Sequence, residues 1–218
     1  MQFLITGGTG FVGSMLTAYL LRRGHTVHIL TRHPKTNTVP GVKHFAWNPE
    51  LQEIQLSALE GVDYIIHLAG AGVADKRWNK KYKQEILNSR VQSGALLRNT
   101  LNNHPHTVQG IISASAIGYY GPDKEGHTFT EQDPPGDNFL SDTCKVWEES
   151  MMGIDRVQLC TLRFGIIFGK DGGAFPKFMA PLKYGLSAIL GNGKQVISWI
   201  HREDVCRMIE FAVQHNLN

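Results

Sequence analysis

The sequence predicts an α/β protein built on a doubly wound parallel sheet with helices on both faces. Strand patterns and helix patterns alternate from residue 2 to about residue 170, as expected when helices connect successive parallel strands. Hydrophobic residues make up 42% and charged residues 19% of the 218 residues, which is typical of a globular protein with a buried core. Beyond that point the alternation fades into segments punctuated by glycine and proline.

Each element is predicted from its own pattern. Helices are expected where apolar residues recur at helical spacing, and strands where short apolar runs end at turn residues. The strands are expected at 2–6, 26–31, 42–46, 63–69, 109–115 and 157–164. The helices are expected at 10–23, 77–103, 138–152 and 203–213. These elements divide the chain into a first domain at residues 1–165 and a small, incomplete C-terminal lobe at residues 166–218.

The first strand runs into three glycines at three-residue spacing, Gly7, Gly10 and Gly13. The first permits a tight turn, the second lets the backbone approach a ligand, and the third lets the next helix pack closely on the strand. Free N–H groups at the start of that helix attract negative charge. A plain strand-to-helix turn is the alternative, but it needs only one glycine. We therefore expect a Rossmann-type domain that holds a dinucleotide pyrophosphate at Gly7, Thr9, Gly10, Phe11, Val12 and Gly13.

The end of the second strand distinguishes between the two nicotinamide cofactors. An acidic residue there would accept hydrogen bonds from the ribose hydroxyls of NAD. This chain has Thr31 followed by Arg32, and no carboxylate. A guanidinium suits a 2′-phosphate, which it recognises through paired, charge-assisted hydrogen bonds. The sequence therefore favours NADP(H) over NAD(H), and the alternative is that Arg32 is a solvent-facing loop residue.

Composition and spacing disfavour several other partners. The formal charge is only +3, and the basic stretch at 76–83 leads into an apolar helical pattern, so nucleic-acid binding is not expected. The three cysteines are far apart and the ten histidines lack metal-binding spacing, so neither disulfides nor a metal site are expected. No apolar run approaches membrane-spanning length, and the chain opens directly on a strand. We therefore expect a cytoplasmic protein without membrane contact or a signal peptide.

Five segments carry further motifs in a consistent order, Thr6–Gly13, His67–Gly70, Ser113–Gly121, Arg163–Gly169 and Ser198–Val205. Together they resemble the extended short-chain dehydrogenase/reductase superfamily, in its NAD-dependent epimerase/dehydratase group. The resemblance implies that the cofactor is also bordered by Leu68, Ala69, Gly70, Arg163, Phe164 and Gly165. Residues 71–72 with 77–78, 89–91 and 146–148 resemble, more narrowly, an atypical epimerase-like subfamily found in bacteria and mitochondria.

The resemblance implies a catalytic serine, tyrosine and lysine, but the usual Tyr-x-x-x-Lys pair is missing. Ser115 fits the serine role. Within the helix expected at 138–152, one alignment puts Ser141 in the tyrosine place and keeps Lys145. The other alignment puts Leu140 and Cys144 in the two places. Neither alignment supplies a tyrosine.

Tyr119 and Tyr120, which follow Ser115 closely, are the candidate replacements for the missing proton donor. A tyrosine needs a nearby cation to work at neutral pH, because its ordinary pKa is near 10. The alternative is that both tyrosines only line the pocket, as a tyrosine does there in active members of the resembled group. Cys144 is the weaker candidate for a nucleophile, because lone cysteines are usually inert core residues.

Residues 170–200 are expected to shape a pocket for a small-molecule substrate, as the resemblance implies. Candidates for its apolar lining are Met179, Leu182, Leu186, Ile189 and Trp199, each with a core role as the alternative. The chain stops soon after the helix at 203–213, so the lobe is expected to be either truncated or minimal. By analogy, the helices at 77–103 and 138–152 are candidate faces of a homodimer.

Two functions remain from these observations. The first is an NADP(H)-dependent oxidoreductase or epimerase-like enzyme that acts on a carbonyl compound or a nucleotide sugar with unusual proton chemistry. The second is an NADPH-binding sensor or regulator that has lost turnover. Ser115 and the organised segment at 165–200 favour the enzyme, whereas the missing tyrosine favours the sensor.

Overall fold

The computed structural model describes residues 1–36, 38–123, 127–186, 193 and 196–217. Within this part of the chain, seven strands form one sheet in the order β4-β3-β2-β1-β5-β6-β7. Their bounds are β1 Gln2–Thr6, β2 Thr26–Thr31, β3 Val42–Asn48, β4 Glu53–Ile54, β5 Tyr64–His67, β6 Gly110–Ala116 and β7 Gln158–Phe164. The strands from β3 to β7 along the sheet run parallel, and the short β4 is antiparallel to β3. The predicted doubly wound parallel sheet is confirmed.

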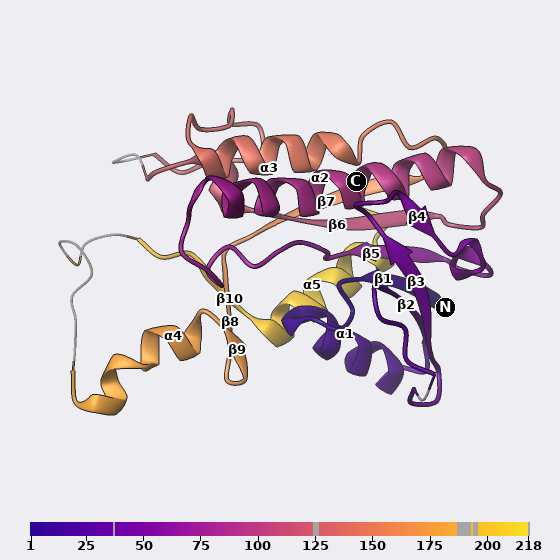
Figure 1. Cartoon of the computed structure of the whole chain (residues 1–218), viewed down its shortest axis with the longest axis horizontal. Coiled ribbons are helices and arrows are strands. Elements are labelled where there is room, and N and C mark those ends of the chain that lie inside the picture. The colour runs from indigo at the N-terminus through magenta and orange to yellow at the C-terminus, as the bar shows by residue number, and fades with distance from the viewer. Residues whose placement is uncertain (37, 124–126, 187–192, 194–195, 218) are drawn as a thin grey trace.

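Helices cover both faces of this sheet (Figure 1). Helices α1 Phe11–Arg22 and α5 Arg202–Gln214 lie together on one face, and α2 Lys80–Asn103 and α3 Phe139–Ser150 lie together on the other. Each of the four predicted helices is confirmed, with small shifts at the ends. The helix predicted at 77–103 begins at Lys80, because the Asn79 side chain accepts a hydrogen bond from the Tyr82 N–H at 2.8 Å and caps the first turn. Short 3-10 helices lie at η1 Leu56–Leu59 and η2 Ile117–Tyr120.

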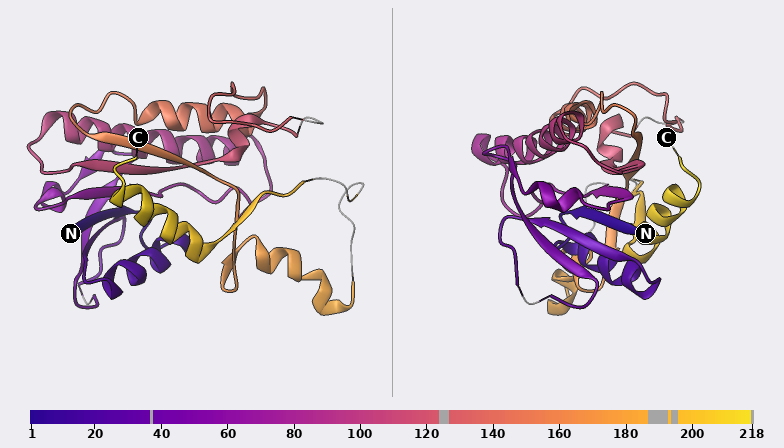
Figure 2. Two further views of the ribbon diagram at one scale, coloured as in Figure 1. Left: turned by 180° about the vertical axis from the view of Figure 1, so that it is seen from behind. Right: turned by 90° about the vertical axis from the view of Figure 1, so that its right-hand side faces the viewer.

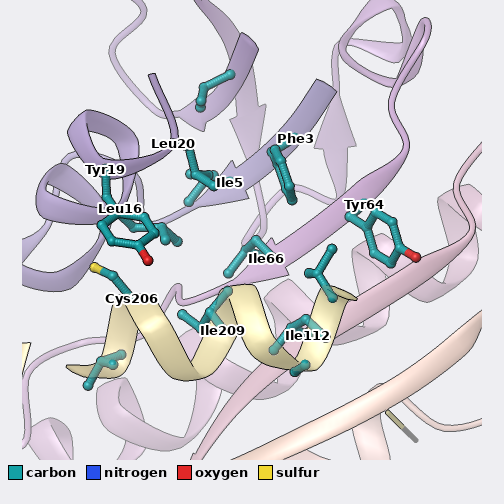
Figure 3. Close-up of a cluster of buried hydrophobic side chains, with 14 of the residues drawn as sticks. Phe3, Ile5, Leu16, Tyr19, Leu20, Tyr64, Ile66, Ile112, Cys206 and Ile209 are labelled. Carbon is teal, nitrogen blue, oxygen red and sulfur yellow. The ribbon is translucent and has the colours of Figure 1, made fainter. Parts of the chain in front are cut away.

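Two hydrophobic clusters hold these layers together. The first lies between the sheet and the α1–α5 pair, as Figure 3 shows for Leu16, Ile66 and Ile209. The second lies on the opposite face, where Leu97 of α2 packs over Ile65 and its neighbours. The central strands are therefore buried on both faces, which explains why β1 and β5 are continuous apolar runs.

Beyond β7 the chain builds a small C-terminal region that projects from the main body (Figure 2). Its sheet has the order β10-β8-β9, with β8 Ile166–Gly169, β9 Gly172–Gly173 and β10 Trp199–His201. Helix α4 Phe175–Met179 and the 3-10 helix η3 Pro181–Tyr184 follow β9. The ammonium of Lys177 reaches back to donate a hydrogen bond to the Ala74 carbonyl. This region therefore lies against the loop that follows β5. Among the described helices, none is long and apolar enough to cross a membrane.

Candidate functional site

The glycine loop between β1 and α1 has the close approaches that its spacing predicts. Gly7 has a φ of +69°, and a Cβ atom there would lie 2.9 Å from the carbonyl of Leu68. A Cβ at Gly13 would lie 2.2 Å from the carbonyl oxygen of Gly7, so only glycine lets α1 begin this close to the strand. In the described part of the chain, no side chain caps α1 at Gly10. The loop therefore presents backbone N–H groups at the positive end of a helix, which suits an anion.

Buried hydrogen bonds join the carboxyl ends of β1 and β5. The hydroxyl of Thr6 accepts from the backbone N–H groups of Leu68 at 3.1 Å and Ala69 at 3.2 Å. It also lies 2.8 Å from Nδ1 of His67, a residue with no solvent exposure. Burial, aided by the nearby Arg90, lowers the pKa of His67 to about 4, so this imidazole is neutral at neutral pH. Residues 68–70, which the resemblance places along the cofactor, are thus held beside the glycine loop.

The proposed 2′-phosphate contact lies at the end of β2, next to β1 in the sheet. Thr31 is half-buried, and its hydroxyl accepts a hydrogen bond from the N–H of His33 at 3.3 Å. Arg32 is exposed. A side chain at this position is accessible to a cofactor that lies across the carboxyl edge of the sheet.

A hollow of about 610 Å³ opens beside the glycine loop. It is lined by Thr9, Gly10, Phe11, Ser14, Met15, Ala18, Asp171, Gly172 and Arg202. The guanidinium of Arg202 lies 4.6 Å from the centre of the Phe11 ring, and its Nη1 donates to the Phe11 carbonyl at 3.3 Å. Gly169, Gly172 and Gly173 pack against the same ring, because a Cβ atom at any of them would lie within 2.8 Å of it. Sequence reasoning missed Arg202, whose signal is an arginine at the first position of α5.

A second, narrower cavity of about 200 Å³ lies at the carboxyl ends of β6 and β7. It is lined by Val73, Ile86, Arg90, Ala116, Ile117, Gly118, Leu140, Thr143, Cys144, Trp147, Phe164, Gly165 and Ile166. We call it the β6–β7 cavity. Leu140 and Cys144 are among its walls, whereas Lys145 is exposed on α3 and is not brought to it. Ser141 is buried and donates to the Gly118 carbonyl at 2.9 Å. Of the two alignments, the one through Leu140 and Cys144 therefore describes the wall of the cavity.

Burial is the main cause that raises the pKa of the Cys144 thiol, and the nearby Glu148 adds to it. These effects outweigh the opposing charge of Arg90. The thiol is therefore kept protonated and is a poor nucleophile, because nucleophilic attack requires the thiolate.

A polar network lies beside the cavity and joins three elements. Ser115, at the end of β6, donates to the Glu148 carboxylate on α3 at 2.6 Å. Arg163 of β7 donates to the same carboxylate through Nε and Nη2, each at 2.8 Å. Its Nη1 donates to the Tyr120 hydroxyl at 2.9 Å, and its guanidinium lies 3.5 Å from the centre of the Tyr119 ring. The hydrogen bonds to Glu148 are the main cause that raises the pKa of Arg163 above its ordinary range.

The expected substrate lining lies on the projecting region. Met179, Leu182, Leu186 and Trp199 are exposed there rather than gathered around a cavity. Ile189 lies outside the described residues. No cluster of three potential metal ligands occurs among the residues that the structure describes.

Comparisons with known proteins agree with this architecture. A family model described as "NAD dependent epimerase/dehydratase family" matches residues 3–218. The epimerase family protein YfhF of Bacillus subtilis is 36% identical over 218 residues, which cover 99% of this chain and 71% of that protein. The epimerase family protein SH2119 of Staphylococcus haemolyticus is 38% identical, with 98% and 71% covered.

Solved structures are similar over the same span. The crystal structure of human epimerase family protein SDR39U1 (isoform 2) with NADPH has a TM-score of 0.86 and 31% sequence identity. The match covers 99% of this chain and 71% of the human chain. The UDP-glucuronic acid 4-epimerase of Bacillus cereus, in complex with UDP-glucuronic acid and NAD, has a TM-score of 0.80 at 18% identity, with 98% and 73% covered. At that identity the likeness concerns the fold alone.

Proposed function

Because the chain belongs to the NAD dependent epimerase/dehydratase family, we propose that it is an NADP(H)-binding oxidoreductase or epimerase that acts on a carbonyl compound or a nucleotide sugar. The observation that carries the proposal is the alignment of three features along one edge of the sheet. These are the uncapped start of α1 behind Gly10, the exposed Arg32 after β2, and the β6–β7 cavity. In doubly wound folds, ligands bind outside the carboxyl ends of the strands.

The residues present fit a nicotinamide dinucleotide phosphate. The backbone N–H groups of Phe11 and Val12 would hold the pyrophosphate, because the Gly10 N–H already donates to the Gly7 carbonyl at 2.9 Å. A Cβ at Gly13 would push the helix away from this position. Arg32 would pair with the 2′-phosphate. Phe164 and Gly165 would border the nicotinamide ring in the β6–β7 cavity. When bound, this cofactor supplies hydride chemistry.

Proton chemistry in the proposal is assigned to Tyr120 rather than Tyr119. Arg163 donates to the Tyr120 oxygen, so the phenolic hydrogen of Tyr120 remains available for donation to a substrate oxygen. Tyr119 instead presents its ring face to the same guanidinium. The Ser115 hydroxyl donates its hydrogen to Glu148. To donate to a substrate carbonyl, the hydroxyl must first rotate so that its hydrogen points away from that carboxylate.

A second candidate function is an NADPH sensor or regulator without turnover. The observation that favours it is the pair of side chains in the cavity wall, Leu140 and Cys144. Leucine has no ionisable group, and the buried thiol is kept protonated, so neither replaces the missing tyrosine and lysine.

Two measurements distinguish these functions. Mass spectrometry of the purified protein identifies the nucleotide it carries. NADPH oxidation is then followed at 340 nm with panels of carbonyl compounds and of nucleotide sugars. NADPH carriage with substrate-dependent oxidation supports the enzyme, and tight NADPH binding with no oxidation across both panels supports the sensor. Absence of any affinity for NADPH overturns the proposal.

A further inference from the structure

We propose that the β6–β7 cavity binds the carboxylate of an organic acid against Arg90, so that the substrate is a small acid with a carbonyl or hydroxyl group close to that carboxylate. This inference rests on the proposed function, because the nicotinamide ring is the other occupant assigned to the cavity. It names the substrate class for that site.

Arg90 is a buried cation without a carboxylate partner. Its side chain extends from α2 into the cavity wall, and the residue is 9% exposed. Its Nη1 donates to the carbonyls of Ala71 at 3.0 Å and Ile86 at 2.9 Å. Among the described residues, no acidic side chain lies within salt-bridge distance of this guanidinium. Carbonyl groups are dipoles and do not neutralise the charge, so burying it unpaired is costly.

Other arginines of the chain do have acidic partners. Arg163 lies 2.8 Å from Glu148, and Arg23 lies 2.6 Å from Glu210. Arg90 is buried, whereas Arg163 is partly exposed and Arg23 is exposed. Arg90 is therefore the arginine for which burial makes an acidic partner most important, and it lacks one. A ligand carboxylate in the cavity would supply the missing charge.

The rest of the cavity wall offers donors and apolar surface. Trp147 is 6% exposed, and its Nε1 has no hydrogen-bond partner among the described residues. Its ring lies under the Arg90 guanidinium at 4.8 Å. The thiol of Cys144 lines the same cavity. A wall that contains a cation and no acidic group suits an acceptor-rich anion.

The remaining walls limit the size of the ligand. Leu140, Ile117 and Phe164 are apolar, and the cavity volume is about 200 Å³. A whole nucleotide sugar exceeds this space, so the part of the ligand near Arg90 is small. In such a space the carboxylate and the reacting carbon lie close together, which points to the class of 2-oxo and 2-hydroxy acids.

The test measures binding of pyruvate and of its neutral amide, pyruvamide, to the full chain saturated with NADP⁺, by isothermal titration calorimetry. These probes have the same size and differ in charge. We expect the acid to bind at least about tenfold more tightly than the amide, since a buried charge pair contributes more than one neutral hydrogen bond. Arg90→Gln is expected to abolish the difference, and Arg98→Gln on the same helix is the matched control that retains it.

Three outcomes overturn the inference. One is equal binding, or no binding, of acid and amide by the wild-type protein. Another is an Arg90→Gln variant that keeps the discrimination. The third is an Arg90→Gln variant that loses affinity for NADP⁺ itself in the absence of acid, which would identify a cofactor phosphate as the partner of Arg90.

Two further controls keep the test decisive. Should Arg90→Gln fail to fold, the wild-type comparison of acid with amide still decides the question, and Arg90→Lys must preserve part of the discrimination. NADPH affinity is measured separately for the wild-type protein. Its absence contradicts the proposed function, whereas its presence without acid discrimination contradicts this inference alone.

Discussion

Ser115 of β6 donates its hydroxyl hydrogen to Glu148 of α3 at a distance of 2.6 Å. The same carboxylate accepts two hydrogen bonds from Arg163 on the adjacent strand β7. Glu148 therefore joins a helix to the ends of two neighbouring strands. It does so beside the β6–β7 cavity, where the proposed chemistry takes place.

Glu148→Gln is expected to lower the free energy of unfolding by about 2–4 kcal/mol, because it leaves the largely buried Arg163 without its charge partner. Denaturant unfolding followed by circular dichroism measures this change. The matched control is Glu85→Gln, which breaks the exposed pair with Lys76 and should change stability by less than about 1 kcal/mol. Equal effects of the two substitutions would show that the Glu148–Arg163 pair does not brace the site.

Gly13→Ala is expected to destabilise the protein by about 3 kcal/mol and to abolish NADPH binding, because its Cβ would overlap the Gly7 carbonyl. Gly24→Ala provides the comparison. Gly24 has a φ of +75° but no atom within 4 Å of the added Cβ, so it incurs backbone strain of about 1 kcal/mol without a clash. Thermal unfolding and NADPH titration of both variants check this. A Gly13→Ala variant with normal NADPH affinity contradicts the assigned role of the loop.

Protonation of His67 is expected to destabilise the fold between pH 6.5 and about 4. The pKa of this buried imidazole is about 4 in the folded chain and near 6.5 when unfolded, so the unfolded state binds a proton first as the pH falls. Above pH 6.5 this group does not affect the free energy of unfolding. As the pH falls from 6.5 to 4 the free energy of unfolding declines, and below pH 4 it is lower by about 3 kcal/mol. Unfolding curves across pH 4–8 measure the slope.

His67→Asn should flatten that slope, because it removes the titrating ring. His104→Asn, at an exposed histidine, is the comparison variant. An unaltered pH dependence in His67→Asn would mean that other groups cause it.

Tyr120→Phe is expected to reduce NADPH-dependent turnover at least about tenfold, because it removes the hydroxyl that Arg163 holds. Tyr119→Phe keeps the ring that stacks on Arg163 and should retain most of the rate. The measurement is kcat with the compound that the oxidation panels identify. Unchanged rates in the double variant would remove both tyrosines from the mechanism.

The fold and the glycine loop were predictable because their signals are local. A backbone turn with positive φ at Gly7 and a helix that starts against the strand at Gly13 impose requirements within a few residues. The short β4 strand was not predicted, because two residues are too few to show the alternation of apolar and polar residues that indicates a strand.

The wall of the cavity was not predictable to a single residue. When the helix is aligned with the Tyr-x-x-x-Lys pair of the family, a shift of one residue puts either Cys144 or Lys145 in the place of the lysine. Both alignments satisfy the helical pattern. The Asn138 side chain fixes the start of α3 by accepting from the N–H groups of Leu140 and Ser141, and tertiary packing then directs Cys144 inward. The partnership of Arg90 with Trp147 likewise depends on two helices meeting in space.

The central claim is that the chain binds NADPH through its 2′-phosphate at Arg32. Parallel calorimetric titrations of NADPH and NADH into the wild-type protein and Arg32→Ala test it most directly, with Arg207→Ala as an exposed control. We expect the wild-type protein to bind NADPH at least about tenfold more tightly than NADH, and Arg32→Ala to lose that preference while its affinity for NADH is unchanged. Equal affinities in the wild-type protein, or tighter binding of NADH, would contradict the account.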